Sequence, residues 1–370
     1  MNSRTARIVF GAGTTLAFAL CAGQFVLGLG DAPRTATFEV REQFKINVPE
    51  NAGKIQIWCA LPQENDPAQQ VADLKIEAPF PHRTEKDSEG NTVLYLEADK
   101  PAAGEITITE TFVIIRKEVK SGVDAGKSQP LSEADRAKYA RYLEANTHVV
   151  IDDRIRKLAA EIVGDEKNTV RQARKLYDWT LENVEYWVKD PKNKKASPVG
   201  STTHCLDTRT GNCTDFHSLW TSLARASGIP TRMIYGSFFK QELDGQDTDQ
   251  SYHCWPEFYV PGTGWVPHDV AVADIFYGTF PSNPDNEVLV RRTTADGYSG
   301  PDPAKVDYYF GNIDERRVTW STGRDLVLMP KPAAGPINAL PKAHIEVDGK
   351  PLAEGATNAW TRKLTYKQKP

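Results

Sequence analysis

The 370-residue sequence has few cysteines and no excess of charge of either sign. Only five cysteines are present, and neither a Cys-x-x-Cys nor a His-x-x-x-His pair occurs among them and the seven histidines. Zinc ligands usually come at such spacings, so we expect no metal and no cofactor. Lysine and arginine number 45 against 49 aspartates and glutamates, a net charge of −4. Nucleic-acid-binding proteins usually carry a basic face, so we expect no nucleic-acid partner.

Charge is also missing from one long run near the N-terminus. Residues 8–30 hold no charged side chain over 23 positions, and two arginines precede them. A basic start followed by an apolar run is typical of a secretory signal, but the run is also long enough to span a bilayer. We interpret residues 1–34 as a signal peptide, or else as an anchor that holds the protein on a membrane through residues 8–30. Both interpretations predict export, so the protein is periplasmic, secreted, or anchored facing outside the cytoplasm.

Export would also decide the state of the cysteines. An oxidising compartment permits a disulfide among the four that lie beyond the N-terminal run. If Cys213 stays reduced, at most two of Cys59, Cys205 and Cys254 can pair. The sequence does not say which two.

Residues 35–119 show the alternation of a β-rich domain. Apolar side chains recur at every second position in three runs, which puts one face of each strand in a core. The runs are Phe38, Val40, Phe44, Ile46 and Val48, then Ile55, Ile57, Cys59 and Leu61, then Ile106, Ile108, Phe112 and Ile114. We predict an all-β sandwich with a structural or binding role, followed by a polar linker at 120–130.

The apolar period changes after the linker, where residues 131–330 form the predicted catalytic domain. Helical patterns cover residues 132–146, 152–163 and 168–184, and the last has a clear apolar face. A proline-rich and alanine-rich stretch ends this domain. The remaining residues, 331–370, are predicted to be a C-terminal tail with one β-hairpin, which turns at an Asp-Gly pair.

The residues that could carry out chemistry lie between Gly211 and Asp274. Cys213 follows a Gly-Asn turn and precedes an apolar helical pattern that ends at Gly228. It therefore falls in the first turn of a buried helix, whose positive end favours thiolate over thiol. The backbone N–H groups of that turn also suit an oxyanion. The alternative interpretation is a buried structural cysteine.

A predicted β-hairpin over residues 251–269 supplies partners for such a nucleophile. Its first strand covers residues 251–260, a Pro-Gly-Thr-Gly turn follows, and the second strand starts with a tryptophan. With a three-residue loop, His253 becomes the diagonal neighbour of Asp269 on one face, about 7–8 Å away between backbones. An imidazole and a carboxylate can close that gap. We predict that Cys213 is a nucleophile, His253 its base and Asp269 the acid that orients the histidine.

Four sequence blocks resemble the transglutaminase-like superfamily, whose pattern runs G-x-C-x-D, R-x-x-G-I-P-x-R, H-x-W-x-E and G-W-x-x-x-D. The matching blocks, in this order, are GNCTDF at 211–216, RASGIPTR at 225–232, HCWPE at 253–257 and GWVPHD at 264–269. The resemblance covers roughly residues 140–275. It implies an α+β, papain-like fold in which the helix bearing the cysteine packs on an antiparallel sheet bearing the histidine and the aspartate. The upstream sandwich resembles, more loosely, the β-domain that often precedes this domain in bacterial members.

The resemblance implies acyl transfer on a protein or peptide substrate through a thioester, with Cys213 as nucleophile, His253 as base and Asp269 as orienting acid. Water or an amine resolves the thioester, so protease, deamidase and cross-linking transferase all stay open. A catalytically silent cell-envelope binding or scaffold protein on the same fold is the alternative. A second oxyanion donor is also needed, and Trp187 and Tyr186, just after a predicted helix, are the candidates.

Cys254 departs from the commonest family form, in which an alanine stands at this position. Because adjacent strand residues alternate faces, we expect Cys254 to point away from His253 and to leave the three catalytic residues undisturbed. We expect Asp215 to stabilise the first turn of its helix, and Arg232 to pair with Asp215 or Glu257.

Overall fold

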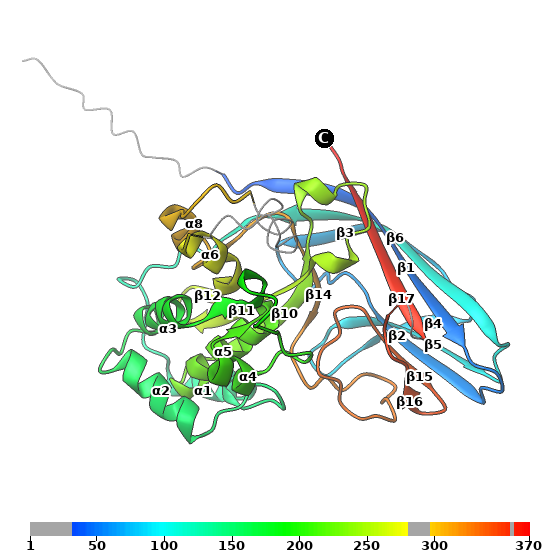
Figure 1. Cartoon of the computed structure of the whole chain (residues 1–370), viewed down its shortest axis with the longest axis horizontal. Coiled ribbons are helices and arrows are strands. Elements are labelled where there is room, and N and C mark those ends of the chain that lie inside the picture. Colours follow the sequence, from blue (N-terminus) through cyan, green and yellow to red (C-terminus); the bar gives the residue numbers. More distant parts are fainter. Residues whose placement is uncertain (1–31, 280–296, 356–358) are drawn as a thin grey trace, which may run out of the picture. The chain divides into compact units, whose positions relative to one another are not determined.

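The computed structural model describes residues 32–279, 297–355 and 359–370, and Figure 1 shows how their helices and strands are arranged. Pro33–Pro370 form one unit by their contacts. The predicted signal peptide or anchor at 1–34 lies almost entirely outside the described residues, so export stays a prediction of the sequence. Within the described ranges, no helix is both long enough and apolar enough to cross a bilayer.

The predicted β-sandwich is confirmed as two antiparallel sheets packed face to face. Phe44 from one sheet and Ile57 from the other are fully buried in the same apolar cluster. The first sheet has the order β17-β1-β6-β3, with bounds Trp360–Gln368, Thr35–Val48, Gly104–Lys117 and Gln69–Glu77. The second has the order β16-β15-β2-β5-β4, with bounds Lys350–Pro351, Ala343–Val347, Lys54–Ala60, Thr92–Asp99 and His82–Lys86.

The C-terminal segment completes this sandwich, although the sequence pattern placed it in a tail of its own. β17 pairs with β1, from Phe38 opposite Gln368 to Ile46 opposite Trp360, and β15 pairs with β2. The hairpin expected at the Asp-Gly pair is present as β15 and β16. The two ends of the chain therefore share both sheets, a long-range pairing that no local pattern reveals.

The rest of the fold packs helices on a four-stranded antiparallel sheet of order β12-β11-β10-β14 (Figure 1). These strands are Gly264–Pro267, Tyr252–Val260, Thr231–Phe238 and Arg317–Thr322. Helix α5 (Cys213–Ala226) lies against β10 and β11, with four helices packed around it. They are α2 (Asp153–Val163), α3 (Thr169–Asn183), α4 (Thr202–Thr208) and α6 (Val270–Tyr277). The predicted α+β class is confirmed, with the cysteine helix on an antiparallel sheet.

Helical periodicity predicted α2 and α3 to within one residue at each end. Asn168 caps α3 by accepting the N–H groups of the first turn, and the predicted apolar face is buried. The helix expected over 132–146 is shorter, because it has no apolar face to bury. It consists of α1 (Glu133–Lys138) and a 3₁₀ turn at Ala140–Leu143. The remaining short elements are β7 (Val119–Lys120) paired with β13 (Asn312–Ile313), β8 (Glu185–Tyr186) paired with β9 (Thr210–Gly211), and α8 (Pro303–Tyr308).

Strand β14 connects the sandwich to the helix-covered sheet. Its Trp320 is fully buried in the same apolar cluster as Phe112 of β6. The Gln69 side chain accepts the Thr319 N–H at 2.9 Å and donates to the Thr319 carbonyl at 3.0 Å. A glutamine amide thus pairs with β14 as a neighbouring strand would. The sandwich therefore fixes the position of β14, including Arg317 at its first residue.

Two glutamates face each other inside the sandwich. Glu42 on β1 stands directly opposite Glu110 on β6, and both are buried. Arg362 donates to Glu42 at 3.0 Å and also pairs with Asp249, which Lys342 contacts in turn. Among the described residues, neither carboxyl oxygen of Glu110 has a hydrogen-bond partner. Burial, and then the charge of Glu42, raise the pKa of Glu110 well above its usual value, and burial raises that of Glu42 despite Arg362.

We expect Glu110→Gln to flatten the pH dependence of stability. The folded protein keeps protons on this acid pair that the unfolded chain releases above a pKa of 4.5. The free energy of unfolding therefore falls as the pH rises from about 5 to about 8, and removing one acid removes part of that fall. Urea unfolding at the two pH values measures it, with the exposed Glu105→Gln of the same strand as control. An equal fall in wild type and Glu110→Gln would contradict the explanation.

Candidate active site

Cys213 is the first residue of α5, where the sequence predicted a helix start. The Asn212 side chain accepts the N–H groups of Thr214 at 2.9 Å and Asp215 at 3.1 Å. The Asp215 carboxylate in turn accepts the Asn212 N–H at 2.9 Å. This capping box confirms the predicted role of Asp215 and occupies the orphan amides on either side of Cys213. The positive end of the helix is thereby fixed at the thiol.

Gly211 is required here by a close approach rather than by an unusual backbone conformation. A Cβ at this position would lie 2.3 Å from the Asp215 Cβ. The same aspartate also accepts the N–H groups of Ser197 at 3.0 Å and Ser201 at 2.8 Å. The Gly-x-Cys-x-Asp spacing therefore has a physical reason, because the carboxylate that ties this turn together fills the space beside the glycine.

His253 and Asp269 meet as predicted, although not on two paired strands. The hairpin has the predicted three-residue loop and stays in register as far as Glu257 opposite Pro267. The chain then leaves the strand, and Asp269 becomes the N-cap of α6, accepting the Val272 N–H at 3.0 Å. Its other carboxylate oxygen lies 2.7 Å from His253 Nε2. The predicted pairing is correct, and the strand position of Asp269 is wrong, because the side chain caps a helix.

Arg317 on β14 is a third partner of the Asp269 carboxylate, and the sequence analysis missed it. Its Nη1 donates to Asp269 at 2.7 Å and its Nε to Asp314 at 2.9 Å. The guanidinium is fully buried and lies 3.9 Å from the centre of the Phe238 ring. The only available signal was an arginine at the start of a strand that alternates apolar and hydroxyl side chains, far in sequence from the four blocks that resemble the family.

The charges of the site favour an ionised thiol beside a protonated imidazole. The pKa of Cys213 lies well below its usual value, chiefly because the Cys254 thiol hydrogen-bonds to it and, against the opposing effect of burial, because His253 is near. Burial alone would lower the pKa of His253, but the charges of Asp269 and Cys213 outweigh it and raise that pKa. His253 and Arg317 hold the pKa of Asp269 well below its usual value, although burial opposes them. These directions favour a thiolate, an imidazolium and a carboxylate together in one buried site.

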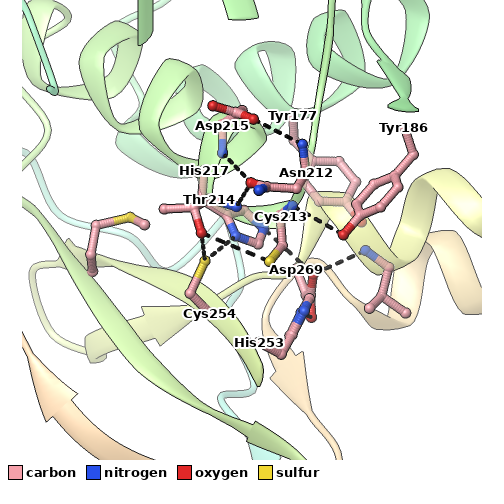
Figure 2. Close-up of polar contacts among 12 residues, drawn as sticks. Tyr177, Tyr186, Asn212, Cys213, Thr214, Asp215, His217, His253, Cys254 and Asp269 are labelled. Atoms are coloured by element: carbon pink, nitrogen blue, oxygen red, sulfur yellow. Dashed lines mark hydrogen bonds and ion pairs between the residues drawn. The ribbon is translucent and has the colours of Figure 1, made fainter. Parts of the chain in front are cut away.

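Cys254 lies closer to the chemistry than its place on the strand predicted. Its Sγ lies 3.5 Å from Thr214 Oγ1 and 3.4 Å from His217 Nδ1. Figure 2 shows its sulfur on the Cys213 side of the site, close to the His217 ring. That Cys254 does no harm to the three catalytic residues stays a prediction, but the sequence analysis missed these contacts with α5. The physical reason is that α5 packs on β11 and places its Thr214 and His217 side chains against Cys254.

Tyr186 is the oxyanion candidate that contacts Cys213 among the described residues. The Cys213 N–H donates to the Tyr186 hydroxyl at 3.1 Å (Figure 2). The short parallel pairing of β8 with β9 carries Tyr186 there, because β9 ends two residues before α5 begins. Trp187 starts the following 3₁₀ turn and packs against the apolar core.

The sequence left open whether Arg232 pairs with Asp215 or with Glu257. Arg232 pairs with Glu257, at 2.6 Å. A cavity of about 450 Å³ opens beside α5, and its lining includes Asn212, Thr214 and Tyr252 together with Asn338, Ala339, Pro341, Lys342 and Ala343 of the C-terminal segment. The Tyr252 hydroxyl lies 2.9 Å from Thr214 Oγ1, and that oxygen lies 3.9 Å from Cys213 Sγ. The cavity therefore reaches the edge of the site.

We expect Arg317→Met to destabilise the fold by about 3 kcal/mol, because it leaves the buried Asp269 charge with one partner fewer. Arg317→Lys keeps a charge but cannot bridge Asp269 and Asp314, so its cost should be smaller but measurable. Urea unfolding of both variants gives the two values, with Arg83→Met, an exposed ion-paired arginine of β4, as control. A loss no larger than that of the control would mean that Arg317 does not hold the carboxylate.

Comparisons with known proteins agree with this geometry. The transglutaminase-like superfamily model matches residues 156–270. The chain is 26% identical over 341 residues to an uncharacterized protein of Haemophilus influenzae, covering 85% of this chain and 87% of that protein. Its structure is similar to that of a candidate cysteine protease from Cytophaga hutchinsonii, with a TM-score of 0.53 and 17% identity over 90% of this chain and 98% of that one. At this identity, the likeness shows the fold alone.

The periplasmic domain of TgpA from Pseudomonas aeruginosa is also similar, with a TM-score of 0.34 and 16% identity over 71% of this chain and 91% of that one. The family match includes all three predicted catalytic positions, Cys213, His253 and Asp269. Residues 156–270 are a domain of the transglutaminase-like superfamily.

Proposed function

We propose that this protein is a thiol-dependent acyl-transfer enzyme that acts on amide groups of protein or peptide substrates. The observation that carries the proposal is the placement of the Cys213 thiol, with its lowered pKa, at a helix N-terminus beside an imidazole that Asp269 holds at 2.7 Å. A thiolate is the nucleophile in such reactions, and a fixed imidazole serves as its proton carrier. Sites of this kind are suited to attack on a carbonyl.

In the proposed reaction, the Cys213 thiolate attacks the carbonyl carbon of the amide. His253 gives its proton to the leaving nitrogen as the C–N bond breaks, and a thioester remains on Cys213. Water or an amine then attacks the thioester while His253 takes up its proton. The C–S bond breaks and the thiolate returns.

The oxyanion of each tetrahedral intermediate needs donors that are in place before the reaction. We propose the Tyr186 hydroxyl as one donor, and as the second the Cys213 N–H, which donates to that hydroxyl at 3.1 Å and would turn to the oxyanion when it forms. The cavity walled by Asn212 and Thr214 is the proposed approach for the substrate. We also infer export from the N-terminal run, which would direct the enzyme to substrates outside the cytoplasm.

We expect iodoacetamide to label Cys213 rapidly well below the ordinary thiol pKa of about 8.5, because its thiolate is stabilised. His253→Ala removes the imidazolium, so labelling should slow at neutral pH and its pH profile should shift upward. Peptide mass mapping between about pH 4 and pH 9 gives the rate at each cysteine. His82→Ala, an exposed histidine of the sandwich, is the matched control.

An ordinary thiol profile at Cys213, or equal rates in wild type and His253→Ala, would remove the basis for the enzyme. The catalytically silent binding or scaffold protein would then be the better description. The described fold is compatible with either outcome.

We expect p-nitrophenyl acetate to give a burst of one nitrophenol per active site, with the acetyl group found on Cys213 by intact-mass and peptide analysis. A primary amine added after the burst then tests the acceptor, since faster turnover with amine indicates a transferase and unchanged turnover a hydrolase. Cys205→Ala should keep the burst, and Cys213→Ala should abolish it. A burst that persists in Cys213→Ala would assign the acylation to another residue.

A further inference from the structure

Two thiols meet in the site, and they come from different elements. Cys213 Sγ on α5 and Cys254 Sγ on β11 approach the same atom, Thr214 Oγ1, at 3.9 Å and 3.5 Å (Figure 2). Both cysteines are buried and reduced. The other two cysteines of the described residues lie elsewhere, Cys59 in the sandwich core and Cys205 on α4.

Cys254 has a histidine of its own. His217 Nδ1 lies 3.4 Å from the Cys254 sulfur, and His217 Nε2 lies 3.4 Å from Asp269 Oδ1. His253 occupies Oδ2 of the same carboxylate. The site therefore contains two Cys–His sets on one aspartate, of which the proposed acyl transfer uses only the set of Cys213 and His253.

The pKa values of the two sulfurs are shifted in opposite directions. Burial, and then the hydrogen bond and charge of Cys213, raise the pKa of Cys254 well above its usual value, whereas the pKa of Cys213 is lowered. These directions favour a thiolate at Cys213 and a thiol at Cys254. Oxidants react with the thiolate, and a neighbouring thiol that can lose its proton then resolves the product to a disulfide.

We propose that Cys213 and Cys254 form a redox pair, in which a peroxide converts the Cys213 nucleophile into a reversible disulfide with Cys254. The Cys213 thiolate attacks one peroxide oxygen, the O–O bond breaks, and the departing hydroxide takes up the proton that the Cys213 thiol had given up and becomes water. Cys254 gives its proton to His217 and attacks the sulfenic sulfur of Cys213. The S–O bond breaks, and the oxygen leaves as a second water with that proton.

Two thiols are oxidised and one hydrogen peroxide is reduced to two waters, so the step balances without a further reactant. The disulfide removes the nucleophile, and an external dithiol restores it by exchange. The inference needs only the two thiols and His217. It goes beyond the proposed acyl transfer and does not depend on it.

The test is peroxide treatment of the reduced full chain, followed by alkylation of the remaining thiols and peptide mass mapping without reduction. We expect a linked Cys213–Cys254 peptide, and a loss of Cys213 labelling that dithiothreitol reverses. In Cys254→Ala the thiol that resolves the sulfenic acid is missing, so Cys213 should proceed to sulfinic acid, which dithiothreitol does not reverse. Cys205→Ala, which removes a buried cysteine outside the pair, should behave as wild type.

His217→Asn separates the two chemical steps. The first step, measured by trapping the sulfenic acid with dimedone, should keep its rate within about twofold, because His217 is not the base of Cys213. Closure of the disulfide should slow by about tenfold or more, because Cys254 loses its proton acceptor. Equal slowing of both steps would contradict the role given to His217.

A wild-type map with irreversible oxidation of Cys213 and no Cys213–Cys254 peptide overturns the redox pair. This result needs no variant to fold. The nitrophenol burst of the untreated protein reports separately on acyl transfer, so failure of either idea is seen independently of the other.

Discussion

The site depends on one buried negative charge, the carboxylate of Asp269. A carboxylate without exposure to water is costly unless its lone pairs are occupied by donors, preferably charged ones. Here His253, Arg317 and the Val272 N–H supply them at 2.7, 2.7 and 3.0 Å. Each partner comes from a different element, β11, β14 and α6, so the carboxylate fixes the relative positions of all three. The same charge raises the pKa of His253 against the effect of burial, and His253 in turn adds to the effect of the Cys254 hydrogen bond, which lowers the pKa of Cys213.

This constraint extends into the β-sandwich, which otherwise contributes no chemistry. Arg317 reaches Asp269 only because β14 is held in place, and Gln69 and the apolar cluster around Trp320 hold that strand. The sandwich is itself completed by β17, from the opposite end of the chain. The N-terminal sheets are therefore part of the support of the active site, through a continuous series of contacts. The sandwich and the helix-covered sheet are therefore not two independent modules, because the first holds a strand of the second in place.

The Asp269 carboxylate also links two cysteine–histidine pairs. Its two oxygens each face a histidine, and each histidine faces a cysteine, so the proposed acyl-transfer and redox chemistries would draw on the same buried charge. The two cysteines differ, because burial and the hydrogen bond to the Cys213 sulfur raise the pKa of Cys254, whereas the same hydrogen bond lowers the pKa of Cys213. In this geometry, reactivity and its control by oxidation are properties of one cluster. An alanine at position 254 would remove the second and weaken the first, because the Cys254 hydrogen bond contributes most to the lowered pKa of Cys213.

The sequence by itself determined the local features: the alternating strands of the sandwich, the capped starts of α3 and α5, and the hairpin that brings His253 near Asp269. These depend on residues close together in the chain, where periodicity, capping side chains and loop length act directly. The tertiary structure alone decided that Arg317, His217 and Cys254 join the site, that Tyr186 rather than Trp187 contacts Cys213, and that the C-terminal strands close the sandwich. Such contacts arise where elements that are distant in sequence cross. The stability of a buried charge depends on every element that supplies it with a partner, and no local sequence pattern encodes that set of partners.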